Sequence, residues 1–331
     1  MKISDYYTYA PKSKIKAGDA NPNGKYQFYT SSPDESRRCD EYLYDCKAIV
    51  MGTGGSATLH YYDGKFSTST DCLTLIPNEK IRAKYLYYFF LANMDVLEAG
   101  FKGAGLKHTS KGYIDNIEIT KIPSLPSQDK IVNLFDELAL RIEKERRQIE
   151  KLDELVKARF VEMFKGKYDS FKVDEKLKTT SGGTPKSSVS EYYDGGDIPW
   201  LTSGEVNYGD ITKPSSYITE KGLNNSSAKW VPENSIVIAM YGATAGKVGI
   251  VRYKTTTNQA VCSVLPNDNF NQEFLRYAFQ DISEELTSKA IGGGQPNISQ
   301  TIIKNSYIVD APIEEQERFA SFAKQVDKSK F

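Results

Sequence analysis

The sequence of 331 residues is poor in side chains that bind metals, and it lacks long apolar runs. It contains two histidines, His60 and His108, and no second cluster of ligand residues flanks either one. Because a zinc site needs several such ligands close together, we expect no metal. No run of about 18 apolar residues occurs, and the N-terminus has no hydrophobic signal region, so we expect neither a membrane span nor a secretory leader.

The sequence also lacks closely spaced cysteines and a net charge. Cys39, Cys46, Cys72 and Cys262 show no Cys-x-x-Cys spacing and are typical of reduced thiols in a cytoplasmic protein. The 43 basic residues are balanced by 43 acidic residues. Because a protein that holds DNA by itself is usually basic, this balance argues against an autonomous nucleic-acid binder.

Signatures of catalysis are lacking as well. The segment Gly242-Ala-Thr-Ala-Gly-Lys resembles a phosphate-binding loop, but it is one residue short and has no Ser or Thr after the lysine. Gly52-Thr-Gly-Gly fits a tight turn better than a phosphate cradle, because glycine tolerates a positive φ. No clustered acid–base constellation indicates a nuclease or a glycosylase.

The strongest local pattern is a long apolar stripe in residues 128–164. No Pro or Gly interrupts it, and Pro123, Pro126 and Gly166 bracket it, as expected for one helix of roughly 55 Å at about 1.5 Å per residue. The apolar residues recur at coiled-coil spacing. We therefore expect these side chains to pack on another helix: Ile131, Phe135, Leu138, Ile142, Ile149, Leu152, Val156 and Met163.

An internal repeat relates residues 26–135 to residues 197–323. Tyr85-Leu-Tyr-Tyr-Phe-Phe corresponds to Phe274-Leu-Arg-Tyr-Ala-Phe, and Ser124-Leu-Pro-Ser-Gln corresponds to Pro312-Ile-Glu-Glu-Gln. Six such matches occur in the same order, mostly 187–189 residues apart, so chance is a poor explanation. The repeated unit is a mixed domain followed by the start of a helix.

Each copy predicts short strands, one amphipathic helix and then glycine-rich loops. The strands are expected at 72–76, 235–240 and 260–265, and the helices at 83–98 and 272–287. The fold class is therefore α+β, with two similar domains separated by a long coiled-coil helix. We expect a first domain at 1–125, the central helix at 126–165, a second domain at 166–311 and the incomplete start of a second long helix at 312–331.

Motifs of the second copy carry a family resemblance. They are Ser181-Gly-Gly-Thr-Pro, Ile198-Pro-Trp-Leu-Thr-Ser-Gly-Glu-Val, Gly242-Ala-Thr-Ala-Gly-Lys-Val, Thr257-Asn-Gln-Ala and Gln295-Pro-Asn-Ile-Ser. With them, the chain resembles the specificity subunit of type I DNA restriction–modification systems. The first copy, with Gly52-Thr-Gly-Gly-Ser and Tyr62-Asp-Gly-Lys-Phe, is similar to another branch of the same domain. The chain departs from the family in its shortened C-terminal helix.

The resemblance implies a function without catalysis. Each domain would be a target-recognition domain that reads one half of a bipartite site in double-stranded DNA, and the helices would hold the halves apart and dock two methyltransferase subunits. S-adenosylmethionine and ATP would sit on partner subunits, the ATP on a separate restriction and motor subunit, so the chain itself would need no cofactor. An alternative function is a bivalent protein-binding adaptor with a coiled-coil spacer.

Polar loop residues at equivalent places in the two copies are the candidates for DNA contact. Ser and Thr can bond a phosphate or a base edge, although a turn or a helix cap explains them equally well. The amides of Asn258 and Gln259 can pair bidentately with adenine, and lysines can contact phosphates. The predicted set is Thr30, Ser31, Ser32, Lys102, Lys107, His108, Lys111, Thr202, Ser203, Tyr241, Lys247, Asn258, Gln259, Gln295 and Asn297. The DNA sequence recognised does not follow from these residues.

The second long helix, expected at about 313–330, is too short to cover the whole stripe of the first. Some of Ile142, Ile149, Leu152, Val156 and Met163 should therefore stay exposed. A methyltransferase subunit or a second copy of the chain would then cover them.

Overall fold

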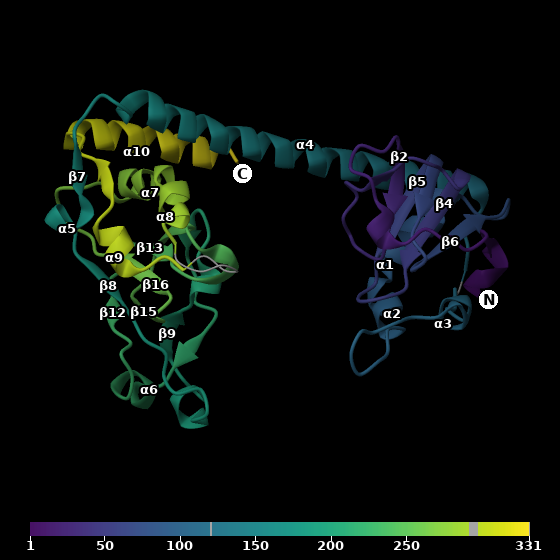
Figure 1. Cartoon of the computed structure of the whole chain (residues 1–331), viewed down its shortest axis with the longest axis horizontal. Coiled ribbons are helices and arrows are strands. Elements are labelled where there is room, and N and C mark those ends of the chain that lie inside the picture. The colour runs from purple at the N-terminus through teal and green to yellow at the C-terminus, as the bar shows by residue number, and fades with distance from the viewer. Residues whose placement is uncertain (120, 291–296, 331) are drawn as a thin grey trace. The chain divides into compact units, whose positions relative to one another are not determined.

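The computed structural model describes residues 1–119, 121–290 and 297–330. The chain divides into two compact units, Met1–Lys144 (unit 1) and Glu145–Phe331 (unit 2) (Figure 1). The division falls inside the helix α4, which runs for 40 residues from Leu125 to Phe164. No helix in the described ranges is long and apolar enough to cross a membrane.

Unit 1 is built on one six-stranded sheet with the order β1-β6-β4-β5-β2-β3. The long strands β4 and β5 pair antiparallel from Tyr44↔Phe66 to Met51↔Leu59, whereas β2 lies parallel to the end of β5. The apolar run Ala48–Met51 of β4 is fully or almost fully buried, as expected for a central strand. The strands are β1 (Tyr7–Tyr9), β2 (Tyr26–Tyr29), β3 (Arg38–Cys39), β4 (Tyr44–Gly52), β5 (Leu59–Thr68) and β6 (Cys72–Pro77).

The helices of unit 1 are α1 (Ala83–Ala92), α2 (Met94–Ala99), α3 (Lys111–Asp115) and the first half of α4. The helix predicted at 83–98 is broken at Asn93, whose side chain donates a hydrogen bond to the carbonyl of Phe89 (2.7 Å). Asn competes for backbone groups in this way and therefore favours helix ends. Leu86 and Phe90 of α1 are buried in a core with Ile49 and Leu75 of the sheet.

Unit 2 divides the equivalent strands among three sheets. Their orders are β10-β14-β13-β16-β8, β11-β9-β15-β12 and β17-β7. The pair β9 with β15 is parallel, as β2 with β5 is in unit 1, and β10 also pairs parallel with β14. The strands are β7 (Ser170–Lys172), β8 (Thr179–Ser181), β9 (Ile198–Leu201), β10 (Asp210–Ile211), β11 (Tyr217–Ile218), β12 (Trp230–Val231), β13 (Ser235–Ala239), β14 (Val248–Val251), β15 (Thr255–Thr257), β16 (Val261–Val264) and β17 (Tyr307–Val309).

The second half of α4 packs with α7, α10 and the strands β13, β14 and β16 in one apolar core of unit 2. The amphipathic segment predicted at 272–287 is two helices that meet at Ile282. The last helix packs antiparallel to α4, because Phe319 lies 5.3 Å from Phe160 between ring centroids and Lys330 reaches Asp153 at 2.6 Å (Figure 1). The helices are α5 (Val173–Lys176), α6 (Glu220–Asn224), α7 (Gln272–Asp281), α8 (Ser283–Ser288), α9 (Gln300–Lys304) and α10 (Ile313–Lys328).

A buried glutamine fixes the start of the closing helix in both units. Gln128 in α4 accepts a hydrogen bond from the backbone N–H of Arg82 (2.7 Å) and donates to the carbonyl of Pro123 (2.9 Å). Gln316 in α10 makes the same pair of bonds to Asn271 (2.9 Å) and to Ala311 (2.8 Å). The repeat seen in the sequence is therefore a repeat of structure.

The helix boundaries differ slightly from the predicted ones. The helix α4 begins at Leu125 and contains Pro126 in its first turn, where a missing N–H costs nothing. It ends at Phe164, and Gly166 with φ +72° reverses the chain shortly after it. The helix α10 ends at Lys328, close to the predicted end.

Candidate nucleic-acid interface

Four loops of unit 2 meet at one end of its sheets. The backbone of Asn258 donates to the carbonyl of Leu201 (3.0 Å), and the hydroxyl of Thr244 donates to the carbonyl of Ser203 (2.6 Å). The carbonyl of Met240 accepts a hydrogen bond from the N–H of Ile298 (2.9 Å). The segments around Thr202, Tyr241, Asn258 and Asn297, which are far apart in the sequence, therefore form one surface.

The predicted residues of this surface differ in how free their side chains are. Tyr241 is 38% exposed, and Gln259 and Asn297 are also exposed. The hydroxyl of Thr202 is already used, since it donates to the carboxylate of Glu205 (2.9 Å) in a capping box. Ser203 and Lys247 are half-buried. Gln295 lies outside the described residues.

Asn258 shapes the turn that carries it. Its side-chain oxygen accepts a hydrogen bond from the N–H of Ala260 (3.1 Å). At the equivalent place in unit 1, the hydroxyl of Ser69 accepts from the N–H of Asp71 (3.4 Å). Because one lone pair of the Asn258 oxygen is engaged and its orientation is fixed, the amide group presents its NH₂ as the free end.

The loops of unit 1 meet in the same way. The hydroxyl of Ser31 donates to the carbonyl of Asp71 (2.6 Å) and accepts from the N–H of Thr53 (3.2 Å), while the carbonyl of Thr53 accepts from Thr109 (3.0 Å). Ser32 is half-buried, and its hydroxyl accepts from the N–H of Asp34 (3.2 Å).

Thr30 differs from the other predicted residues of this set. Its side chain is buried at 3% exposure and closes the turn to Ser32, so it shapes the loop rather than facing a ligand.

Of the predicted basic residues of unit 1, Lys102, Lys107 and His108 lie on an exposed hairpin-like loop, and Lys111 begins the helix α3 that follows it. Lys102 and His108 exchange two backbone hydrogen bonds of 3.0 Å, and the carbonyl of Lys107 accepts from Gly55 (2.9 Å). Lys111 places its amine 4.3 Å from the ring centre of Tyr9. Three lysines and a histidine therefore line the side of the loop surface, where phosphate oxygens could approach.

The predicted helix stripe is covered at one end only. Val156 and Met163 are buried in the core of unit 2, and Leu152 packs partly against it. Ile142 and Ile149 are 55% and 37% exposed, as expected for the uncovered part. In unit 1 the stripe residue Ile131 is half-buried, whereas Phe135 and Leu138 are 42% and 46% exposed.

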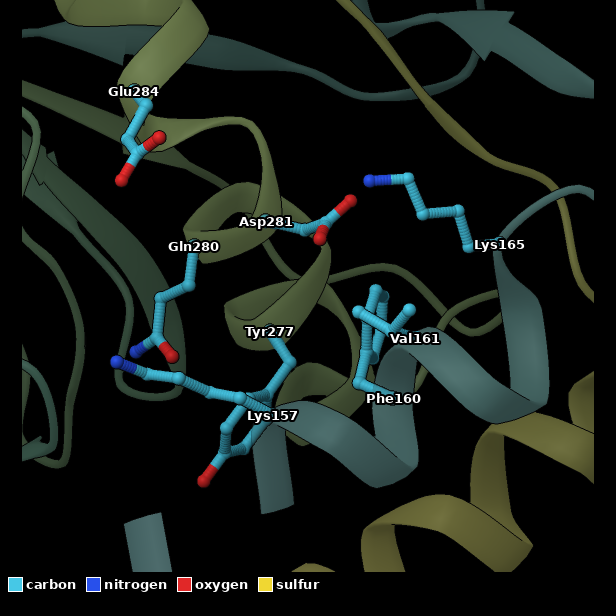
Figure 2. Close-up of a pocket in the computed structure, with 8 residues that line it drawn as sticks. All are labelled: Lys157, Phe160, Val161, Lys165, Tyr277, Gln280, Asp281 and Glu284. Atoms are coloured by element: carbon cyan, nitrogen blue, oxygen red, sulfur yellow. The ribbon is translucent and has the colours of Figure 1, made fainter. Parts of the chain in front are cut away.

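A cavity of about 330 Å³ lies between the second half of α4 and the helices α7 and α8 (Figure 2). The amine of Lys165 points toward the carboxylate of Asp281, and Lys157 and Glu284 also line the space. Because the two lysines are offset by two carboxylates, the cavity does not favour a phosphate. In the described part of the chain, no group of three or more His, Cys, Asp or Glu could hold a metal ion.

Comparison with known proteins gives the family. The type I restriction modification DNA specificity domain matches residues 1–154 and 165–331. The chain is 24% identical over 278 residues to the EcoR124I/EcoR124II specificity subunit of Escherichia coli, covering 79% of this chain and 67% of that protein. It is 30% identical over 165 residues to the MjaIX specificity subunit of Methanocaldococcus jannaschii, covering 48% of this chain and 38% of that protein.

Solved structures share the fold. The crystal structure of an S subunit of a type I restriction–modification system from M. genitalium has a TM-score of 0.62 at 16% identity, covering 100% of this chain and 89% of that chain. A chain from a structure on complex assembly of a type I system has a TM-score of 0.52 at 17% identity, covering 100% and 90%. At these identities the likeness is one of architecture.

The fold and the matched domains define the class: two DNA specificity domains joined through a long helix. The chain belongs to the family of type I restriction–modification DNA specificity domains. It is a specificity subunit, which recognises DNA targets and is not itself catalytic. The adaptor alternative is not favoured by this membership.

Proposed function

We propose that the loop surface of each unit reads one half of a bipartite DNA target. The observation that carries the proposal is a shared set of loop anchors with different side chains on them. The N–H of Ser69 donates to Tyr29 (2.8 Å) where Asn258 donates to Leu201 (3.0 Å), and the carbonyl of Thr53 accepts from Thr109 where Met240 accepts from Ile298. Because the same backbone hydrogen bonds hold the loops of both units while the exposed side chains differ, the two surfaces suit two different half-sites.

The chemistry of the two surfaces differs in a way that suits this division. In unit 2 the exposed candidates are the amide and phenol groups of Gln259, Asn297 and Tyr241, which can bond base edges. In unit 1 the exposed candidates are cations, including Lys102 and Lys107, which suit phosphate oxygens. Since the whole chain has no net charge, partner subunits would supply much of the remaining phosphate contact.

The proposed partners are double-stranded DNA, two methyltransferase subunits and a restriction and motor subunit, in the cytoplasm. S-adenosylmethionine and ATP would be bound by those partners rather than by this chain. The exposed stripe on α4, including Ile142 and Ile149, is the surface we assign to docking. In the absence of a methyltransferase, a second copy of the chain would cover the same stripe.

The test compares one substitution in each unit, in the full chain co-expressed with its methyltransferase subunits. Gln259→Ala should relax one position in one half of the methylated motif, at a cost of about 1–3 kcal/mol in discrimination, and leave the other half unchanged. Lys107→Ala should instead weaken duplex binding for all sequences. It should also lower the slope of log affinity against log salt concentration by about 1, as expected for the loss of one phosphate contact. If Gln259→Ala alters both halves or neither, the assignment of this loop is wrong.

A further inference from the structure

Beside the loop of Asn258 and Gln259 lies a second segment that the sequence analysis did not assign to DNA reading. This segment, residues 182–185, follows β8 and contains Thr184. The hydroxyl of Thr184 donates a hydrogen bond to the side-chain oxygen of Gln259, and both residues are exposed. The contact joins positions 75 residues apart in the sequence.

The position of Thr184 is fixed by its neighbours on both sides. The carbonyl of Gly183 accepts a hydrogen bond from the indole N–H of Trp200 (3.1 Å), and the carbonyl of Pro185 accepts from the hydroxyl of Tyr193 (2.5 Å). The N–H of Gly183 donates to the carbonyl of Thr257 (3.0 Å), one residue before Asn258. Thr184 is therefore held on the same backbone that presents the amide loop.

Two glycines make this close approach possible. A Cβ on Gly182 would lie 1.7 Å from the carbonyl oxygen of Thr257, and a Cβ on Gly183 would lie 2.7 Å from the carbonyl carbon of Ser227. Only a residue without a side chain fits between such backbones. Unit 1 has a related arrangement, since Thr70, the counterpart of Gln259, donates its N–H to the carbonyl of Ile15 in the segment after β1.

We propose that Thr184 is a positioning residue for base recognition, because it holds the oxygen of Gln259 and leaves the NH₂ group directed outward as a donor. The inference rests on the proposed function of this loop. Asn258 is oriented in the same sense by the N–H of Ala260, so the two neighbouring amides both present donors. The loop then recognises acceptors on a base edge, such as N7 and O6 of guanine or O4 of thymine.

The bidentate adenine contact expected from the sequence uses the same amide group and stays a prediction. That contact needs the amide oxygen to accept from N6 of adenine while the NH₂ donates to N7. In this loop the oxygen of Gln259 already accepts from Thr184, so one lone pair is left for such a contact. The hydrogen bond between two exposed groups is weak in water, but it gains strength once a bound duplex excludes solvent.

The experiment uses the full chain co-expressed with its methyltransferase subunits and reads the methylated motif by sequencing. Thr184→Val, which keeps the shape but removes the hydroxyl, should lower discrimination at the position that Gln259→Ala relaxes. The expected loss is about 5-fold to 150-fold for Gln259→Ala and a smaller one for Thr184→Val. The double variant should be no worse than Gln259→Ala alone, because the two residues act as one group.

Three further variants separate this role from a merely structural one. Thr184→Ser restores the hydroxyl and should restore the motif, whereas Thr212→Val, an exposed control in the same unit, should change nothing. Gln259→Glu keeps the oxygen that Thr184 holds but replaces the outward donor with a charged acceptor, so it should lose the same position.

The outcomes distinguish the inference from the proposed function. If Gln259→Ala relaxes the motif but Thr184→Val leaves it intact, or lowers methylation at all sites equally, Thr184 does not position the amide. If Gln259→Ala itself leaves the motif unchanged, the proposed function of the loop fails instead.

Discussion

The closing helices of the two units begin alike and then differ in what covers them. In unit 2, Ala323 and Val326 of α10 are 0% and 7% exposed, because the second half of α4 packs on α7 and α10 together. The equivalent residues of unit 1, Phe135 and Leu138, are 42% and 46% exposed. The same helix start therefore needs a third helix to complete its burial, and among the described residues unit 2 provides one within its own bounds.

The polar contacts beside these helices differ in the same direction. In unit 2, Glu273 accepts a hydrogen bond from Arg252 and forms an ion pair with Arg276 (2.9 Å), and the side chains of Glu273 and Arg276 are 8% and 7% exposed. At the equivalent place in unit 1, Lys84 pairs with Asp136 at 2.7 Å, and both side chains are 36% exposed. Where the third helix is present, the pair Glu273–Arg276 is buried.

The largest expected effect tests this difference in burial. Glu273→Gln keeps the shape but removes the charge, which leaves Arg252 and Arg276 with only the more distant or exposed carboxylates of Asp210 and Asp327. Breaking a buried ion pair in this way should cost ~3–5 kcal/mol in the free energy of unfolding of unit 2. Denaturant unfolding would measure the loss of unfolding free energy, and hydrogen exchange would show which unit is destabilised.

The matched control is Lys84→Met in unit 1, where the pair is solvated. It should cost less than about 1 kcal/mol. Equal losses for the two variants would mean that the burial of the pair does not set its contribution, and the comparison between the units would fail at this point.

The second prediction tests what the units share. Gln128 and Gln316 are 0% and 1% exposed, and each bonds one backbone N–H and one carbonyl. Gln128→Ala and Gln316→Ala should each destabilise their own unit by ~2–3 kcal/mol, since two polar groups lose their partners. Gln148→Ala and Gln325→Ala, at exposed positions of the same two helices, should cost little. A much smaller loss for Gln128→Ala would show that water replaces its amide in unit 1.

The shared features were within reach of the sequence, and the differences were not. The internal repeat indicated two similar domains and matched Gln128 with Gln316, and apolar periodicity predicted the helix α4. The same periodicity assigned Val156 to a helix seam without showing that α7 and α10 together bury it. The spacing of apolar residues shows that one face of a helix is apolar. Which element covers that face depends on contacts between segments that are distant in the sequence.

For the candidate site, too, the sequence indicated the general surface but not the role of each side chain. Polar residues in matching loops indicated the surface, and the structure brings Thr202, Tyr241 and Asn258 together there. The burial of Thr30 and the turn made by Asn258 were not visible, because a side chain that bonds its own backbone has the same sequence signal as one that bonds a ligand. Thr184 was missed because its contact with Gln259 spans 75 residues.

The smallest expected effect concerns the exposed stripe of α4. Ile149 and Ile142 lie on one face of the helix and are 37% and 55% exposed, so their burial by a second copy would contribute about 1–2 kcal/mol each. Without a methyltransferase the chain should self-associate, and Ile149→Asp should raise the dissociation constant by about tenfold or more. Sedimentation over a range of concentrations measures this constant.

The control is Lys144→Asp, an exposed change on the opposite side of α4. It adds more negative charge than Ile149→Asp and should leave the association unchanged. A chain that stays monomeric at high concentration, or an equal effect of the two variants, would show that the exposed stripe is not the contact surface.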